Sequence, residues 1–354
     1  MVFHQPASMP SPARFKAHSA IKEFDLIRSL RREFGGGHAT VIRGIGDDAA
    51  VVEPTPGRRL VLTTDLLAEG IHFDLCTASF EDVGYKAAVA NLSDIAAMGG
   101  TPQYLLVALA IPRSGTRRMV GQLYRGMMAA CRPHRVRLIG GDTSASLGGW
   151  FVGIVLIGST AARRALLRSG ARAGDDLYVT GTLGDSLAGL KLLRSPRTPA
   201  TLPAGQRRFL VQRHLRPTPR VHEGRWLSSG RWASSAIDVS DGLSGDLRHI
   251  CGESRVGVEL DLSALPISNA CRTYAAATKQ DATALALAGG EDYELLFTVP
   301  RRRRNRFLLE AARHQVRVTR IGTIKSARSG IRGMNPGGHL RLLPVTSYEH
   351  FHNP

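Results

Sequence analysis

The sequence has 354 residues, 43% of them hydrophobic, so it can bury a sizeable core and is long enough for two domains. Its apolar runs are short, and none predicts a membrane-spanning helix of about 20 residues, which excludes an integral helical membrane protein. The net charge of +18 would suit a protein that binds nucleic acid. However, basic residues are spread along the chain and aromatic residues make up only 6% of it, which favours a solvated basic surface.

The N-terminal segment and the cysteines exclude further classes. Residues 1–20 mix Pro, Ser, Ala and scattered basic residues without an apolar run, which predicts a flexible arm rather than a secretory signal. The four cysteines are far apart and form no Cys-x-x-Cys pair, so neither a disulfide framework nor a zinc ribbon is indicated. Reduced cysteines of this kind are typical of a cytoplasmic protein.

The first half of the chain alternates strands and helices. Apolar residues at helical spacing predict a first helix over 21–34, before three consecutive glycines. Short apolar runs then predict strands, and apolar residues three and four apart predict helices between them. The strands are expected at 60–64, 104–111, 135–139 and 151–158, and the helices at 80–98 and 116–133.

A second series of strands and helices follows residue 160. Strands are predicted at 176–180, 235–239, 257–262, 293–299 and 316–321, with helices after the turn at 181–184 and at 243–251 and 305–314. The pattern predicts an α/β (α+β) fold of two domains, over 21–160 and 161–354.

Acidic residues recur inside short glycine-rich or apolar segments, which is unusual in a chain this basic. A carboxylate beside a buried strand must be paired, hydrogen-bonded or bound to a cation, because an isolated buried charge is very costly. Carboxylate oxygens suit Mg²⁺, which combines a few of them with substrate phosphates. The segments are Gly46-Asp47-Asp48, Thr63-Thr64-Asp65, Ser93-Asp94, Gly140-Gly141-Asp142, Asp238-Val239-Ser240-Asp241 and Gly290-Glu291-Asp292.

Each segment also has an ordinary interpretation. A single Gly-Asp-Asp or Gly-Gly-Asp is more often a turn or a helix cap than a metal site. Asp94 differs, because it interrupts an Ala-rich apolar helix in which Asp has poor propensity. At this position, an inward-facing side chain that binds a ligand is at least as well supported as an exposed one. The number of segments together favours metal binding. His72 is compatible with a substrate contact, a general base or a structural hydrogen bond.

Known nucleotide-binding motifs are missing from the sequence. It contains neither a Gly-x-x-x-x-Gly-Lys-Ser/Thr loop nor the His-Arg-Asp and Asp-Phe-Gly pair of protein kinases. Phosphate groups would therefore be held through metal ions, glycine amides and a few arginines.

The acidic segments, in their order along the chain, resemble the thiamine-monophosphate kinase family. This family belongs to a superfamily with aminoimidazole ribonucleotide synthetase and selenophosphate synthetase, and the match runs from Glu23 to Phe351. Besides the acidic segments, it rests on Glu69-Gly70-Ile71-His72-Phe73, Asn91 to Gly99, Arg168-Ser169-Gly170-Ala171 and Gly289 to Leu295.

The resemblance implies a purine-synthetase-like fold that dimerises by joining N-terminal strands into a β-barrel, with ATP near the dimer interface. It further implies ATP-dependent phosphorylation of thiamine monophosphate, with several Mg²⁺ ions held by Asp48, Thr63, Thr64, Asp65, Asp94, Asp142, Asp238 and Asp241. The implied contacts to ATP are Gly141, Asp142, Arg168 and Ser240. Those to thiamine monophosphate are His72, Glu291 and Tyr348.

Two other functions remain open at this stage. One is a sibling ligase or synthetase that uses ATP to activate a different phosphorylated substrate. Selenophosphate synthetase itself is disfavoured, because Cys76 lies well past the first acidic segment. The other is a non-enzymatic nucleic-acid-binding protein, which the basic charge alone would suggest.

Overall fold

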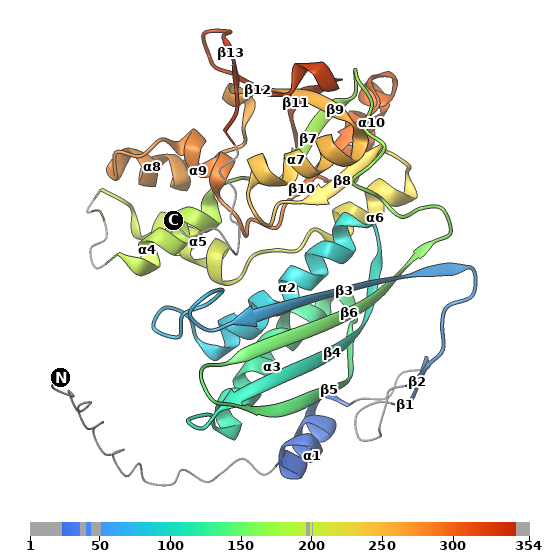
Figure 1. Ribbon diagram of the computed structural model, residues 1–354, viewed down its shortest axis with the longest axis vertical. Helices are drawn as coiled ribbons and strands as arrows, with labels where there is room; N and C mark the ends of the chain where they lie inside the picture. Colours follow the sequence, from blue (N-terminus) through green and yellow to red (C-terminus); the bar gives the residue numbers. More distant parts are fainter. Residues whose placement is uncertain (1–22, 36–39, 44–50, 196–198, 200, 345–354) are drawn as a thin grey trace, which may run out of the picture.

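The computed structural model describes residues 23–35, 40–43, 51–195, 199 and 201–344, and it consists of two α/β halves stacked along the long axis (Figure 1). The N-terminal half is built on a four-stranded sheet with the strand order β3-β6-β4-β5, in which β4 and β5 are parallel and the other pairs antiparallel. Its elements are α1 (Glu23–Phe34), β1 (Val41–Arg43), β2 (Val51–Val52), β3 (Arg58–Ala68), α2 (Phe80–Ala97), β4 (Thr101–Pro112), α3 (Arg117–Cys131), β5 (Arg137–Ser146) and β6 (Phe151–Ala161).

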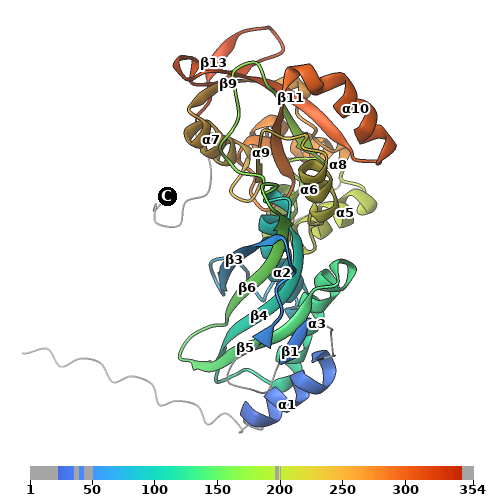
Figure 2. The same ribbon diagram turned by 90° about the vertical axis from the view of Figure 1, so that its right-hand side faces the viewer.

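Helices α2 and α3 cover one face of this sheet (Figure 2). Helix α2 begins with a capping box, in which Ser79 Oγ accepts from Asp82 N at 3.2 Å and the Asp82 carboxylate accepts from Ser79 N at 3.3 Å. The two helices cross closely because Gly84 has no side chain, and a Cβ there would lie 2.0 Å from the Leu123 carbonyl oxygen. Nearly all sides of α2 are consequently buried.

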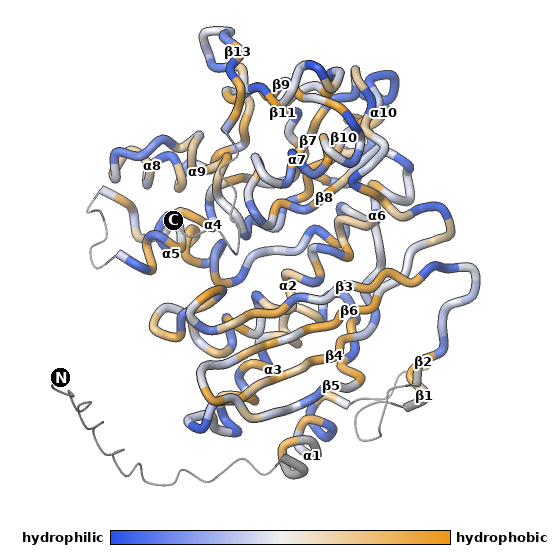
Figure 3. The backbone as a smooth tube through the Cα atoms, in the orientation of Figure 1, coloured by the Kyte–Doolittle hydropathy of each residue, from blue (hydrophilic) through white to orange (hydrophobic). Residues whose placement is uncertain are grey.

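The other face of the sheet is apolar and exposed. Alternation along β3 directs Leu60, Leu62 and Leu66 away from α2, and they are 53%, 63% and 59% exposed. Among the described residues no helix covers this face (Figure 2), although its strands are largely hydrophobic (Figure 3). An exposed apolar patch of this kind marks an interaction surface.

The C-terminal half contains a seven-stranded sheet in the order β13-β12-β9-β11-β7-β10-β8, antiparallel except between β12 and β9. Its strands are β7 (Asp176–Thr180), β8 (Ser235–Asp238), β9 (Val256–Asp261), β10 (Leu295–Val299), β11 (Val318–Ser326), β12 (Ile331–Met334) and β13 (Leu340–Leu342). Its helices are α4 (Asp185–Arg194), α5 (Ala204–Leu215), α6 (Val221–Ser229), α7 (Leu243–Ser254), α8 (Asn269–Ala277), α9 (Ala282–Ala288) and α10 (Arg304–Arg313).

The two halves meet along α2, which contacts α5, α6 and β8. Helix α6 approaches α2 closely at Gly224, where a Cβ would lie 2.0 Å from the Ala96 carbonyl oxygen. One hydrophobic cluster therefore runs from the N-terminal sheet into the C-terminal half, where it includes Trp226, Phe297 and Phe307. This contact holds the acidic end of α2 beside the C-terminal end of β8.

Most predicted elements are confirmed, with shifted ends. The predicted strand 135–139 is wrong at both ends: Arg135 is left-handed (φ +60°) after a short 3-10 turn, and β5 continues to Ser146. Asp142 therefore lies inside a strand. The helix predicted over 116–133 ends at Cys131, ahead of Pro133. No described helix is long and apolar enough to cross a membrane. The predicted arm, residues 1–20, lies outside the described residues.

Candidate functional site

Three carboxylates from separate elements converge where the halves meet. Asp65 lies on the α2-facing side of β3, Asp94 lies in the last turn of α2, and Asp238 ends β8. Ser93 Oγ donates to Asp238 Oδ2 at 2.7 Å, and the Thr63 hydroxyl donates to Asp94. Strand alternation and the cross-domain contact of α2 thus bring together residues more than 140 positions apart.

The carboxylates repel one another, and burial strengthens the effect. Burial and then the charge of Asp94 raise the pKa of Asp65 to about 6. Burial raises the pKa of Asp238 to about 7, with further contributions from Asp94 and Asp65. The pKa of Asp94 is also raised by burial, although the Thr63 hydroxyl and the charge of Arg168 oppose this. A cluster that is costly to ionise in the protein alone is suited to a cation.

The donor set fits Mg²⁺ without forming a closed cage. Within the described part of the chain, no three His, Cys, Asp or Glu side chains are grouped tightly enough to hold a metal ion alone. Mg²⁺ in phosphoryl-transfer sites usually takes one or two carboxylates and completes its shell with substrate phosphates and water. Asp65, Asp94 and Asp238 repel one another, and a bound cation would relieve this repulsion, as such a site requires.

The loop after β8 carries Ser240 and Asp241 directly on from Asp238, and Asp246 holds this loop. Asp246, in the first turn of α7, accepts from the backbone amides of Asp241 and Gly242 at 3.3 and 3.1 Å. Burial, Asp238 and Asp241 raise the pKa of Asp246 to about 8. Asp246 is not among the residues singled out from the sequence, although an acidic residue in the first turn of a helix is a recognisable signal, because the helix dipole favours it there.

The loop that carries Glu291 is bound to the loop after β8. The backbone amide of Glu291 donates to the Ser240 carbonyl at 2.7 Å, and that of Tyr293 donates to the Val239 carbonyl at 2.9 Å. Both Glu291 and Tyr293 have left-handed backbone conformations, with φ of +61° and +52°. Non-glycine residues in this region are uncommon and concentrate at functional sites.

The neighbours of Glu291 stabilise its ionised carboxylate. Burial alone would raise its pKa, but the charge of Lys86 holds the pKa below its usual value, with smaller effects from the nearby rings of His214 and His72. His72 is thus within electrostatic reach of Glu291, and its Nδ1 accepts from the Ala68 amide at 3.0 Å. The two described residues that the resemblance assigns to thiamine monophosphate are therefore brought together.

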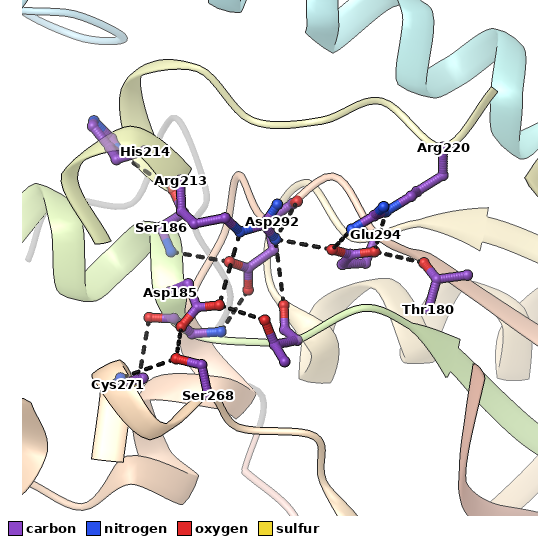
Figure 4. Close-up of polar contacts among 12 residues, drawn as sticks. Thr180, Asp185, Ser186, Arg213, His214, Arg220, Ser268, Cys271, Asp292 and Glu294 are labelled. Atoms are coloured by element: carbon purple, nitrogen blue, oxygen red, sulfur yellow. Dashed lines mark hydrogen bonds and ion pairs between the residues drawn. The ribbon is translucent and has the colours of Figure 1, made fainter. Parts of the chain in front are cut away.

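A buried network behind Glu291 fixes its loop (Figure 4). The fully buried Glu294 accepts from Thr180 Oγ1 and Arg220 Nε at 2.6 Å and from Arg213 Nη2 at 2.9 Å. Asp292, also fully buried, accepts from the Gly184 and Ser186 amides at the start of α4, at 2.6 and 3.0 Å. Of the three acidic residues in 291–294, only Glu291 faces the site. Nothing in the local sequence separates these roles.

Thr64 and Asp142 lie on the exposed face of the four-stranded sheet. Asp142 is level with Ala108 on β4, then with Gly153 on β6 and Leu66 on β3. Three strand spacings separate β5 from β3, or about 14 Å. Within one chain, Asp142 and Gly141 are therefore not brought to the Asp65 cluster. Asp48 and Tyr348 lie outside the described residues.

Comparisons with known proteins agree with this geometry. Residues 46–160 match the family model for the AIR synthase related protein, N-terminal domain, and residues 172–333 match that for the C-terminal domain. Thiamine-monophosphate kinase of Bacillus subtilis (strain 168) is 36% identical, covering 93% of this chain and 99% of its own. That of Salmonella typhimurium is 40% identical, covering 94% and 96%.

Solved structures support the same assignment. A structure described as AaThiL complexed with AMPPCP and TMP is 34% identical, with a TM-score of 0.73, over 96% of this chain and 100% of its own. Identity at this level along nearly the whole chain, together with the convergence of the acidic segments, places the chain in the thiamine-monophosphate kinase family of AIR synthase-related proteins.

Proposed function

We propose that this protein phosphorylates thiamine monophosphate with ATP to give thiamine diphosphate, by direct transfer of the γ-phosphoryl group. The observation that carries the proposal is the convergence of Asp65, Asp94 and Asp238 beside Glu291 and His72. The acceptor phosphate is already ionised at neutral pH, so the reaction needs no strong general base. The difficulty is to hold two polyanions in line, which is a matter of positioning and charge neutralisation.

The chain's own residues would divide this work between them. We assign Mg²⁺ binding to Asp48, Thr63, Thr64, Asp65, Asp94, Asp142, Asp238 and Asp241. When bound, Mg²⁺ supplies positive charge that neutralises the phosphates. Arg168 and the Gly141, Asp142 and Ser240 segments would hold ATP, and the guanidinium offers a two-point phosphate contact. His72, Glu291 and Tyr348 would orient thiamine monophosphate.

The activity is tested by incubating the purified protein with ATP, Mg²⁺ and thiamine monophosphate and separating the products by chromatography. We expect thiamine diphosphate and ADP in equal amounts. Parallel reactions with aminoimidazole precursors test the sibling-ligase alternative. ADP formed from these precursors, with no thiamine diphosphate from thiamine monophosphate, would reject the proposal.

The exposed face of the N-terminal sheet supports a homodimer. A second copy placed against Leu60, Leu62 and Leu66 would bury this apolar surface and close the sheet into a barrel. The same arrangement would bring Asp142 of one protomer toward Thr64 of the other, because both residues belong to this face. The catalytic set that one chain leaves about 14 Å apart would thus be completed across the interface.

We predict that Leu62→Glu converts the proposed dimer to monomers, because a charge buried in the interface would lose its hydration. The KM for ATP should then rise by about tenfold or more, because Asp142 would no longer be brought to the other protomer. Sedimentation velocity and steady-state kinetics measure the two effects. Leu309→Glu is the matched control, since Leu309 on α10 is 64% exposed and Leu62 is 63% exposed. A fully active dimer of the Leu62→Glu variant would contradict the proposed interface.

Mg²⁺ binding should strengthen as the pH rises from about 5 to 8, because the pKa values of Asp65 and Asp238 are about 6 and about 7 without the ion. These raised values favour the protonated folded state, so their contribution to stability is full at low pH and is lost as the pH rises through them. We therefore expect Mg²⁺ to raise the melting temperature more at pH 8 than at pH 5.5. Titration calorimetry in buffers of different ionisation enthalpy should detect proton release at pH 6. Binding without proton release would contradict the assignment.

The remaining assignments follow the same reasoning. We propose domains over 21–160 and 161–354, with residues 1–20 as an arm, and a cytoplasmic location. The cysteines among the described residues are all free thiols, which suits a reducing compartment.

A further inference from the structure

Lys86 is a buried lysine that reaches from the N-terminal half to the substrate-facing carboxylate of the C-terminal half. It lies in α2, two turns before Asp94, and is only 4% exposed. Its Nζ donates to Glu291 Oε2 at 2.6 Å. A buried ammonium group requires compensation by charge and hydrogen bonds, and Glu291 supplies the charge.

His214, at the end of α5, is the second partner of Lys86. Its Nε2 lies 3.2 Å from Lys86 Nζ, and its Nδ1 lies 3.1 Å from Ser186 Oγ and 3.4 Å from Glu291 Oε2. Burial and then the charge of Lys86 lower the pKa of His214 to about 3, so the ring is neutral. Because an ammonium group only donates, Nε2 accepts and the ring proton is on Nδ1. That proton points to Ser186 and to Glu291.

Both contacts to Glu291 use the same oxygen. Lys86 and His214 approach Oε2, whereas among the described residues no hydrogen bond or ion pair engages Oε1. The Glu291 side chain remains 31% exposed although its partners are buried. The carboxylate is thus held by one oxygen and leaves the other available to a ligand.

The backbone of Glu291 offers little freedom for the side chain to adjust. It is left-handed, with φ of +61°, and its amide is bound to the Ser240 carbonyl. Asp292 and Glu294 on either side of Tyr293 are fixed in the buried network of Figure 4. The orientation of the carboxylate is therefore set by Lys86 and His214.

A purely structural tie between the halves is the alternative role for Lys86. Another ion pair already joins the two halves, since Arg216 after α5 contacts Asp82 of α2 at 2.5 Å. Arg216 is 45% exposed on its side chain and its contacts are to the outer side of α2. An ion pair on the surface costs little desolvation, whereas Lys86 is buried and pairs with a carboxylate that stays 31% exposed.

We propose that Lys86, supported by His214, is a positioning residue that orients ionised Glu291 to receive the positively charged thiamine moiety of the substrate. The inference rests on the proposed function, because it takes Glu291 as a contact to thiamine monophosphate. Lys86 acts through Glu291 and does not touch the transferred phosphoryl group. Its role is in the specificity for the acceptor and not in the binding of ATP.

The test is the kinetics of Lys86→Met, a substitution of similar length without charge. We expect the KM for thiamine monophosphate to rise by about tenfold or more, since a charged hydrogen bond is lost, while the KM for ATP changes by less than about twofold. The matched control is Arg216→Met, which breaks the ion pairs of Arg216 with Glu81 and Asp82 across the halves and should leave both KM values unchanged. If Lys86→Met raised the KM for thiamine monophosphate and the KM for ATP equally, or if Arg216→Met raised them in the same way, Lys86 would be only a structural link between the halves. Either result would overturn the inference.

A double-mutant cycle separates the inference from the function on which it rests. Glu291→Gln alone should raise the KM for thiamine monophosphate, and Lys86→Met added to it should have little further effect, because Lys86 acts through that carboxylate. Additive effects would overturn the positioning role. An unchanged KM in Glu291→Gln would instead remove Glu291 from the substrate site. If Lys86→Met does not fold, His214→Ala should give a smaller KM increase of the same selectivity, and a nonselective change would count against the inference.

Discussion

Asp65→Asn should lower kcat by about 10³-fold or more while the protein stays folded, because Asp65 is central to the proposed cation site and metal ions contribute several kcal/mol to such reactions. Asn has the size of Asp and keeps one side-chain oxygen, but it lacks the negative charge that attracts Mg²⁺. Steady-state formation of thiamine diphosphate measures the effect, and circular dichroism checks the fold. The metal-free variant should be at least as stable as the parent at pH 8, because a repelling carboxylate with a raised pKa has been removed.

The matched control for this variant is Asp281→Asn. Asp281 is an exposed N-cap of α9 whose side chain accepts from the Thr283 amide, and Asn caps helices equally well. Activity and stability should both be retained. An Asp65→Asn enzyme with more than a tenth of the parent kcat would show that the Asp65 carboxylate is not needed to hold the metal ion.

Glu294→Gln should cost about 3–5 kcal/mol in the free energy of unfolding, because it leaves the guanidinium groups of Arg213 and Arg220 without their buried counter-charge. Glu294 is fully buried, and the new amide group would also present donors to guanidinium groups that cannot accept. Chemical denaturation followed by tryptophan fluorescence, at one fixed protein concentration, measures the loss.

Glu310→Gln provides the comparison for Glu294→Gln. Glu310 pairs with Arg313 one turn away on α10, and the Arg313 side chain is 73% exposed, so its loss should cost less than about 0.5 kcal/mol. Similar small losses in both variants would indicate that the arginines near Glu294 find solvent or other partners. The buried network would then not be what fixes the Glu291 loop.

The elements with strong local patterns could be predicted from the sequence. Helix α2 was expected over 80–98 and is found at Phe80–Ala97, because its apolar spacing and its Ser79–Asp82 cap are both local features. Strand β7 is predicted over 176–180 and found there, because the short apolar run Leu177 to Val179 is a local feature. Short helices such as α8 and α9 were not assigned, since their stability comes from tertiary packing more than from their own pattern.

The site could be predicted in its residue types but not in its partners. The acidic segments identified Asp65, Asp94 and Asp238, which the structure brings together. Lys86 and His214 lie 128 residues apart, and nothing in their local sequence indicates that both reach Glu291. A lysine inside the Ala-rich part of α2 was nevertheless a signal of the same kind as Asp94. Equally, the pattern of alternation alone could not show that Asp142 lies on the outer face, because β5 was predicted to end before it.

The uncovered face of the N-terminal sheet has a consequence for how the protein accumulates during synthesis. In the described part of the chain, strand β3 lies at the edge of the sheet and exposes Leu60, Leu62 and Leu66, so this edge offers both backbone groups and apolar side chains to a second chain. Exposed edges of this kind nucleate aggregation while they stay uncovered. Under the proposed homodimer, dilution would leave more single chains with this face uncovered, whereas a higher concentration would hasten both dimer formation and the competing aggregation.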